Sequence, residues 1–164
     1  MTLKWIQSRM AHEHQFQALI TWTGAAHGGT QSYKTYSREY RVQIEGKPDL
    51  IASAAAAFYG DASLHNPEDL LLGAISGCHL LSYLAIAARQ GVVVTAYSDE
   101  STATMAIKDG KMRFIEAILR PRVTITAGSD REKARQMHHQ ANQECFIANS
   151  LNFPVHHEAE ITVG

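Results

Sequence analysis

The chain of 164 residues contains only two cysteines and four prolines, and its net charge is −1. Two cysteines are too few for the disulfide framework of a small secreted protein. Fifteen basic residues against sixteen acidic ones leave no basic stripe for phosphate groups, so we expect neither nucleic acid nor an anionic membrane surface as a partner. The first fifteen residues lack the apolar run of a secretory signal, and we therefore expect a cytoplasmic protein.

The length and the absence of repeats, linkers and low-complexity segments predict one domain over residues 1–164. Alternating apolar residues predict strands within residues 16–24, 37–50, 92–107, 111–127 and 154–164. Asp109 and Gly110 predict a tight turn between two of these segments, and Pro121 indicates an edge or a bulge. A long and a shorter helical segment interrupt the strands, so the order of elements predicts an α+β fold.

The long helix is predicted from the segment "NPEDLLLGAISGCHLLSYLAIAARQG", residues 66–91. Asn66 is a favourable N-cap, Pro67 suits the first helical position, and Gly91 suits the stop. Residues 70–88 carry no formal charge, which by length alone is enough to cross a bilayer.

Amphipathic strands on both sides of this helix argue against a membrane span, because a span would leave them nowhere to fold. A helix that is apolar on all sides is covered by protein in a soluble molecule. A single domain of this size can hardly enclose so long a helix, whereas a second subunit can. Gly73 and Gly77, four residues apart, allow two helices to approach closely. We therefore expect a homodimer.

A second helix is predicted within residues 129–152. Ser129 and Glu132 have the spacing of a capping box at its start. Apolar residues then recur at helical spacing and include the second cysteine, Cys145.

The two cysteines allow two interpretations. Free cysteine is among the most buried residue types, so Cys78 and Cys145 can be inert core thiols. Alternatively, packing of the second helix on the first brings them within disulfide range. A thiolate in an apolar site needs a nearby cation, and His79 points about 100° away from Cys78 around the helix. Arg38 and Arg41 are the better candidates, although each also fits a solvated surface position.

Two separate motifs together resemble the OsmC/Ohr family of thiol-dependent peroxidases. The first is "NPEDLLLGAISGCHLLSYL", with Asn-Pro-Glu and a cysteine ten residues after the Glu; the second is "ECFIANSLNFPV", with a later cysteine. The upstream segments "YSREYRVQIEG" and "SAAAAFYGD" resemble the OsmC-like branch, so the resemblance covers nearly the whole chain.

The resemblance implies an intertwined homodimer in which curved antiparallel sheets pack around long central helices and the active sites lie at the interface. It implies reduction of organic hydroperoxides, and of hydrogen peroxide less well, without a cofactor and with an external thiol or dithiol as reductant. By the same resemblance Cys78 is the peroxidatic thiol, Cys145 the resolving thiol, Glu68 the acidic partner and Arg38 the cation. Arg41 remains the alternative to Arg38.

Helix geometry adds an expectation about the subunits. Glu68 and Cys78 are ten residues apart, hence about 15 Å along a straight helix and about 80° around it. Direct contact between them within one helix is therefore excluded. We expect a site lined by both chains of a dimer, with a long arginine side chain or the partner's Glu closing the gap.

Three alternatives stay open. His79, where well-characterised relatives tend to have an aromatic residue, is either a core histidine or a pH-responsive neighbour of Cys78. The pairs His138-His139 and His156-His157 raise metal binding, but no His-x3-His or Cys-x2-Cys spacing is present and we expect no metal. A dimer that keeps the fold without turnover, as a stress-response or ligand-binding protein, is the main rival to an enzyme.

Overall fold

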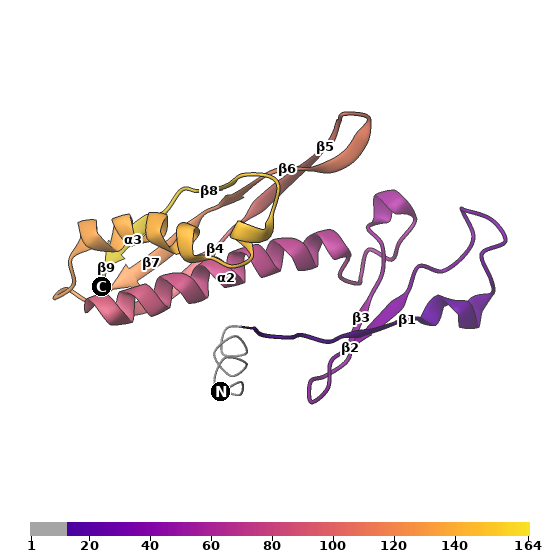
Figure 1. Cartoon of the computed structure of the whole chain (residues 1–164), viewed down its shortest axis with the longest axis horizontal. Coiled ribbons are helices and arrows are strands. Elements are labelled where there is room, and N and C mark those ends of the chain that lie inside the picture. Colours follow the sequence, from indigo (N-terminus) through magenta and orange to yellow (C-terminus); the bar gives the residue numbers. More distant parts are fainter. Residues whose placement is uncertain (1–12) are drawn as a thin grey trace, which may run out of the picture. The chain divides into compact units, whose positions relative to one another are not determined.

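The computed structural model describes residues 13–164, and the chain divides into two compact units, Met1–Pro67 and Glu68–Gly164. In the N-terminal unit three short strands form one antiparallel sheet in the order β1-β2-β3. Their bounds are β1 Leu19–Trp22, β2 Tyr40–Gln43 and β3 Leu50–Ala52. β1 and β2 are shorter than the segments 16–24 and 37–50 that the alternating pattern predicted, and β3 was not predicted as a separate strand. Two 3₁₀ turns, Thr23–His27 and Ala56–Phe58, complete the unit (Figure 1).

Helix α2 spans Pro67–Gln90, which confirms the predicted start at Pro67. At its other end Gly91 has a φ of 75°, and the Val92 N–H donates to the Ala87 carbonyl at 2.9 Å. This is the left-handed helix stop that glycine favours, so the predicted end is confirmed as well.

Within the C-terminal unit, the described residues bury one face of α2. Its buried residues are Ile75, His79, Tyr83, Ile86 and Ala87. Leu81 is 68% exposed, and 28% of the most apolar 18-residue window is buried. By length and composition α2 is the one helix in residues 13–164 that is apolar enough to cross a membrane, a test that core helices of soluble proteins also pass.

The predicted hairpin of two long strands is broken into four shorter ones. They are β4 Val94–Asp99, β5 Thr102–Lys108, β6 Lys111–Leu119 and β7 Pro121–Ile125. β5 pairs with β6 across the turn at Asp109 and Gly110, whose φ angles are 54° and 73°, which confirms the predicted turn. β4 pairs with β7 in a different sheet, so the prediction of continuous strands was wrong.

The predicted final strand is also divided in two, β8 Val155–His157 and β9 Glu160–Val163. β8 runs parallel to β6, and β9 runs parallel to β7. The two sheets of the C-terminal unit, β4-β7-β9 and β5-β6-β8, are therefore mixed, and antiparallel pairing holds only for their β4-β7 and β5-β6 pairs.

Helix α3 spans Arg131–Glu144 and differs from the prediction at both ends. Asp130, and not Ser129, is the N-cap: its Oδ1 accepts hydrogen bonds from the N–H groups of Glu132 and Lys133 at 2.9 and 3.0 Å. Cys145, expected within the helix, lies directly after it in an extended conformation and is followed by a 3₁₀ turn, Ala148–Ser150.

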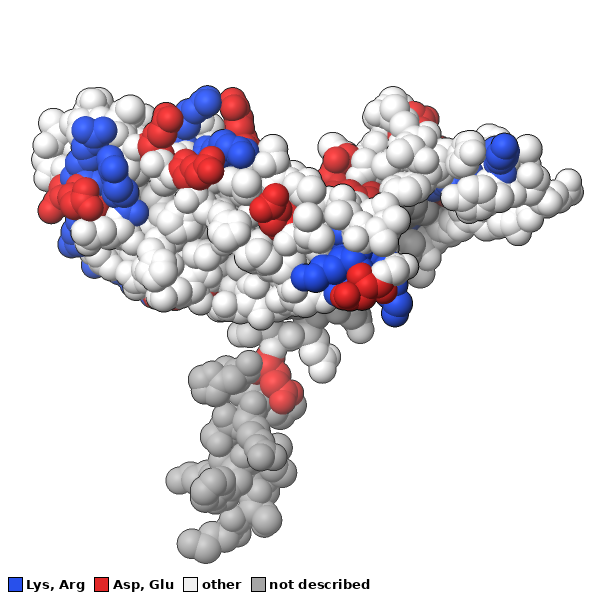
Figure 2. Space-filling view, turned by 90° about the horizontal axis from the view of Figure 1, so that it is seen from above, with Lys and Arg blue, Asp and Glu red and all other residues white. Residues whose placement is uncertain are grey.

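Both helices of the C-terminal unit share one core with the sheet β4-β7-β9, and Figure 1 shows α2 and α3 running side by side along these strands. That core contains Tyr83, Ile86, Ala87, Val92, Val123, Ile125, Ala134, Met137, Ala141 and Ile161. A second cluster, centred on Ile75, Ala117, Leu119 and Val155, lies between α2 and the other sheet. On the face seen in Figure 2, the basic and acidic side chains of the described residues lie next to one another.

Candidate functional site

The structure brings the two cysteines together. Cys78 lies at the middle of α2 and is half-buried, whereas Cys145 lies after α3 and is 1% exposed. Both are free thiols, and Cys78 lies near enough to Cys145 to raise the pKa of the Cys145 thiol. The two cysteines thus lie near one another, as expected from the packing of the second helix on the first, and their pairing in a disulfide stays a prediction.

Burial, followed by the effect of the neighbouring Cys78, raises the pKa of the Cys145 thiol from 9.0 to about 11. The Ala148 N–H donates to the Cys145 sulfur at 3.4 Å from the other side. Cys145 is therefore a buried, protonated thiol that neighbours Cys78.

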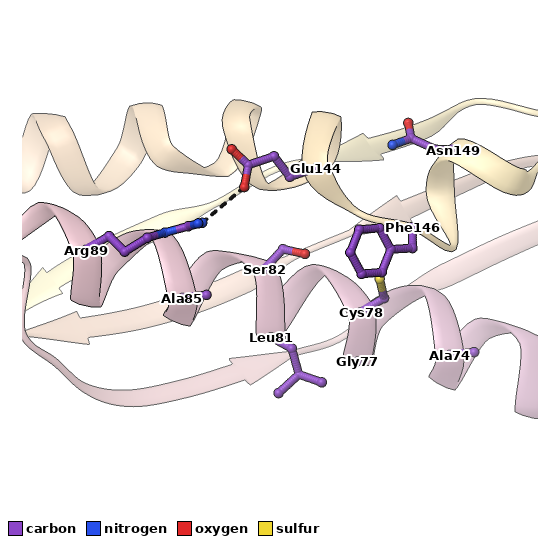
Figure 3. Close-up of a pocket in the computed structure, with 10 residues that line it drawn as sticks. All are labelled: Ala74, Gly77, Cys78, Leu81, Ser82, Ala85, Arg89, Glu144, Phe146 and Asn149. Atoms are coloured by element: carbon purple, nitrogen blue, oxygen red, sulfur yellow. Dashed lines mark hydrogen bonds and ion pairs between the residues drawn. The ribbon is translucent and has the colours of Figure 1, made fainter. Parts of the chain in front are cut away.

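An open cavity of about 800 Å³ lies along α2 beside Cys78 (Figure 3). α2 contributes one face to it, and the segment after α3 contributes Phe146 and Asn149. The α2 residues in the lining are Ala74, Gly77, Cys78, Leu81, Ser82, Ala85 and Arg89. Most of the lining surface is apolar, so the cavity suits an apolar molecule that presents a reactive group to Cys78.

One ion pair marks the end of the cavity that lies furthest from Cys78 along the helix. Arg89 Nη2 contacts Glu144 Oε2 at 3.1 Å (Figure 3). Gln140 also donates to Oε1 of Glu144 at 2.8 Å. Both charged side chains are largely exposed, so the pair contributes little to stability, but it gives this end of an otherwise apolar cavity a polar boundary.

Glu68 lies in the first turn of α2, ten residues before Cys78. Its Oε2 atom is buried and has no hydrogen-bond partner among residues 13–164. A buried carboxylate oxygen without a donor is costly, and a cationic partner relieves that cost.

Arg38 belongs to the N-terminal unit and lies in a pocket of aromatic rings. Its guanidinium donates to the carbonyl oxygens of Tyr36, at 2.9 Å, Tyr59, at 3.4 Å, and Tyr33. The rings of the same three tyrosines surround it, with centroids 4.1 to 5.3 Å from Cζ. Arg41 instead forms an exposed salt bridge with Asp49 at 3.4 Å, as a surface arginine does.

The buried face of α2 also carries a histidine contact that the sequence did not predict. His79 Nε2 lies 3.0 Å from Nδ1 of His138 in α3, and both side chains are buried. Burial, followed by the charge on His157, lowers the pKa of His79 to about 4, while burial and the charge on His79 lower that of His138 to about 3. His79 is therefore a core histidine, one of the two alternatives that the sequence left open.

The histidines do not form a metal centre in the part of the chain that the structure describes. No group of three or more His, Cys, Asp or Glu side chains in residues 13–164 has an arrangement that could hold an ion.

The sequence did not predict that Phe146, Asn149, Arg89 and Glu144 line the cavity beside Cys78. For Phe146 the available signal was an aromatic residue directly after Cys145, and the structure shows its side chain to be 82% exposed.

The sequence model of one protein family, described as OsmC-like protein, matches residues 60–160. The match covers more than half of the chain and includes both cysteines and Glu68. The chain belongs to the OsmC-like protein family. The resemblance read from its two motifs is thereby confirmed.

Solved structures of other OsmC-like proteins share the fold. An OsmC-like protein of unknown function from Vibrio cholerae is 28% identical, with a TM-score of 0.83, over 90% of this chain and 100% of that one. Organic hydroperoxide resistance proteins from Elizabethkingia anophelis and Legionella pneumophila are 15% and 16% identical, with TM-scores of 0.66 and 0.63. These cover 93% and 92% of this chain and 98% and 100% of theirs. A search among curated proteins finds no match.

Proposed function

We propose that this OsmC-like protein is a cysteine-based peroxidase that reduces organic hydroperoxides in oxidative stress defence, with Cys78 as the attacking thiol and Cys145 as the resolving thiol. One observation carries the proposal: the buried Cys145 thiol neighbours Cys78, which borders an apolar cavity. The names of the Elizabethkingia and Legionella relatives support the same activity.

In the first step the Cys78 thiolate attacks the terminal oxygen of the hydroperoxide. A sulfur–oxygen bond forms, the oxygen–oxygen bond breaks, and the alkoxide leaves and takes up a proton to become the alcohol. Cys78 is oxidised to a sulfenic acid while the peroxide is reduced. The apolar cavity favours substrates with a hydrocarbon body over hydrogen peroxide.

In the second step the Cys145 sulfur attacks the sulfur of the Cys78 sulfenic acid. The sulfur–sulfur bond forms, the sulfur–oxygen bond breaks, and the hydroxide leaves as water with the Cys145 proton. Condensation with a second thiol prevents further oxidation of Cys78 to the sulfinic acid. An external thiol or dithiol then supplies two electrons and two protons and restores both cysteines, as the reducing cytoplasm allows.

Arg38 and Glu68 complete the proposed site. A guanidinium close to Cys78 favours the thiolate and polarises the departing oxygen. The buried Glu68 oxygen that lacks a donor is a suitable anchor for such a cation. Arg38 is preferred to Arg41, because Arg41 is engaged in a solvent-exposed pair with Asp49.

The proposal includes a homodimer that covers the open face of α2. Leu81 is 68% exposed there, and apart from the adjacent residues and the backbone of α2 itself no atom of residues 13–164 lies within 4 Å of the position that a Cβ would take at Gly73 or Gly77. Light scattering after size exclusion should give twice the chain mass. Leu81→Asp should give monomer, whereas Ile107→Asp, at a β5 residue that is 71% exposed, should remain dimeric. A monomeric wild type, or a protein recovered only with membranes, would contradict this part.

The test of the chemistry adds one equivalent of cumene hydroperoxide to the reduced protein. Intact-mass and peptide mass spectrometry should show loss of two hydrogens and a Cys78–Cys145 disulfide. Cys78→Ser should abolish peroxide consumption, and Cys145→Ser should consume peroxide while Cys78 accumulates sulfenic and sulfinic acid. If both thiols of the wild type stay reduced, the noncatalytic alternative holds.

A further inference from the structure

A buried contact between two imidazole rings joins the helix that carries Cys78 to the helix that precedes Cys145. His79 Nε2 and His138 Nδ1 are 3.0 Å apart, and the ring planes differ by 9°. The ring centroids are 5.3 Å apart, which is 2.3 Å more than the distance between the two nitrogens. This is the geometry of an in-plane N–H···N hydrogen bond between rings that lie end to end, in which the donor hydrogen points along the acceptor's lone pair.

The pair is sealed from water. His79 is 1% exposed and His138 is 0% exposed. The outer nitrogens, His79 Nδ1 and His138 Nε2, are buried without a hydrogen-bond partner in residues 13–164. Each buried nitrogen without a hydrogen bond lowers the stability of the fold. Two apolar side chains at these positions would avoid that loss of stability. The bond between the two rings is the one polar interaction that this arrangement provides.

Neighbouring groups hold the two rings in place. Tyr83 stacks on His138 with centroids 4.1 Å apart, and its hydroxyl donates to the Ala134 carbonyl at 3.0 Å. The ring centroid of His157 in β8 lies 5.8 Å from that of His79 and 5.9 Å from that of His138. The rings therefore have little freedom to rotate, and the distance between α2 and α3 at this level is fixed by rigid groups.

This fixed point lies beside the two thiols. His79 directly follows Cys78 in α2, and His138 precedes Cys145 by seven residues, which is about two helical turns. Disulfide formation requires the sulfurs to approach to about 2.05 Å, with Cβ atoms about 3.5–4.5 Å apart. A small change in the separation of α2 and α3 therefore has a large effect on whether the two sulfurs can bond.

We propose that His79 and His138 are positioning residues whose mutual hydrogen bond sets the separation of α2 and α3 at which Cys78 and Cys145 form a disulfide. The significance of this bond for turnover rests on the proposed peroxidase function. The geometric claim does not, because the two thiols can be oxidised by other means.

The experiment compares substitutions that keep or remove the bond. Gln places an amide near the position of Nε2 and Asn places one near that of Nδ1, so His79→Gln and His138→Asn retain a donor or acceptor at the contact. His79→Leu and His138→Leu remove it at similar volume. Ile125→Val, in the same core on β7, is the control for a plain loss of stability.

The first measurement is the equilibrium between the Cys78–Cys145 disulfide and glutathione, which reports the effective concentration of one thiol at the other. Each Leu variant should lower this effective concentration about tenfold, the scale of one buried hydrogen bond, while the Gln and Asn variants stay close to wild type. Ile125→Val should leave the effective concentration unchanged even if it loses as much unfolding free energy as the Leu variants. If the Leu variants lose stability but keep the wild-type effective concentration, the histidines are merely structural and the proposal is overturned.

The second measurement uses cumene hydroperoxide and separates the proposal from the function on which it rests. In the Leu variants Cys78 should be oxidised at the wild-type rate, but the sulfinic acid should accumulate in place of the disulfide. Rescue by Asn or Gln distinguishes the hydrogen bond from packing. Absence of any Cys78 oxidation in the wild type would refute the peroxidase proposal alone and leave the glutathione result standing.

Discussion

The backbone N–H of Arg120 donates a 2.6 Å hydrogen bond to Oδ1 of Asp99, at the point where both long strands of the predicted hairpin break. Oδ2 of the same carboxylate accepts from Ser76 of α2 at 2.5 Å and from Ser101 at 3.1 Å. Asp99 therefore ties α2 to the corner where the chain passes from one sheet to the other.

Replacing Asp99 by Ala should lower the free energy of unfolding by about 3 kcal/mol, since three donors to a charged acceptor lose their partner. Ser101→Ala removes one of the three bonds and should cost about 1 kcal/mol. Urea unfolding followed by circular dichroism measures both. Equal stability of the two variants would show that the corner does not depend on the carboxylate.

Arg38→Ala should slow the oxidation of Cys78 by organic hydroperoxide at least about tenfold. The reason is that a guanidinium beside Cys78 would favour the negatively charged thiolate, which is the attacking form, and its removal takes that stabilisation away. Arg38→Lys keeps the positive charge but not the planar guanidinium, so its oxidation rate should lie between those of the wild type and Arg38→Ala. Stopped-flow measurement of the single-turnover rate is the appropriate assay.

Arg41→Ala is the matched control, because its exposed pair with Asp49 contributes little and its loss should change the rate less than about twofold. Thermal melts of the three arginine variants identify any that lose the fold, since Arg38 also holds three carbonyls of the N-terminal unit. If Arg41→Ala slows the oxidation of Cys78 and Arg38→Ala does not, Arg41 is the cation of the site.

Stability should fall as the pH falls from about 6.5 to about 4. His79 and His138 have pKa values near 6.5 in the unfolded chain but about 4 and about 3 in the fold, so in this window only the unfolded chain binds their protons. His157, whose pKa is also lowered, acts in the same direction, while the charge on Asp99 opposes the effect at His79. The loss should be on the order of 3 kcal/mol.

Urea midpoints measured at about pH 7 and about pH 5 test this expectation. The double variant His79→Gln/His138→Asn contains no titrating group at the contact and should show a distinctly flatter pH dependence. The same slope in both proteins would mean that other groups cause it.

Phe146→Ala should weaken the binding of aromatic hydroperoxides without affecting hydrogen peroxide. Phe146 lines the cavity beside Cys78, and truncating an aromatic contact costs about 1 kcal/mol of binding, or about fivefold. The KM for cumene hydroperoxide should rise by that factor while kcat/KM for hydrogen peroxide stays the same. A uniform loss for both substrates would show that Phe146 acts on the thiols and not on the substrate.

Local signals in the sequence were sufficient to predict both ends of α2 and the turn at Asp109. Proline at a first helical position, glycine after a last turn and an Asp-Gly pair each act through the φ angles of one or two residues. Such features need no information from distant parts of the chain.

The break at Asp99 and the contact between His79 and His138 could not be predicted in this way. Both depend on a partner that is distant in sequence, 21 residues away for Asp99 and 59 for His79. The alternation of apolar residues continues across the break, so the pattern alone predicts one strand. The proximity of Cys78 and Cys145 was anticipated because both cysteines were expected on apolar helix faces, although Cys145 lies just outside its helix.

That position of Cys145 has a mechanical consequence. A residue inside a helix moves only with the helix, because its backbone is bonded to the turns before and after it. Cys145 has φ and ψ angles of −72° and 112° and begins an irregular segment, so a rotation at this single joint carries its sulfur while α3 and its buried histidine remain in place. The reduced and oxidised forms can therefore differ by a local rotation of the segment that begins at Cys145, while α2, α3 and the sheets keep their positions.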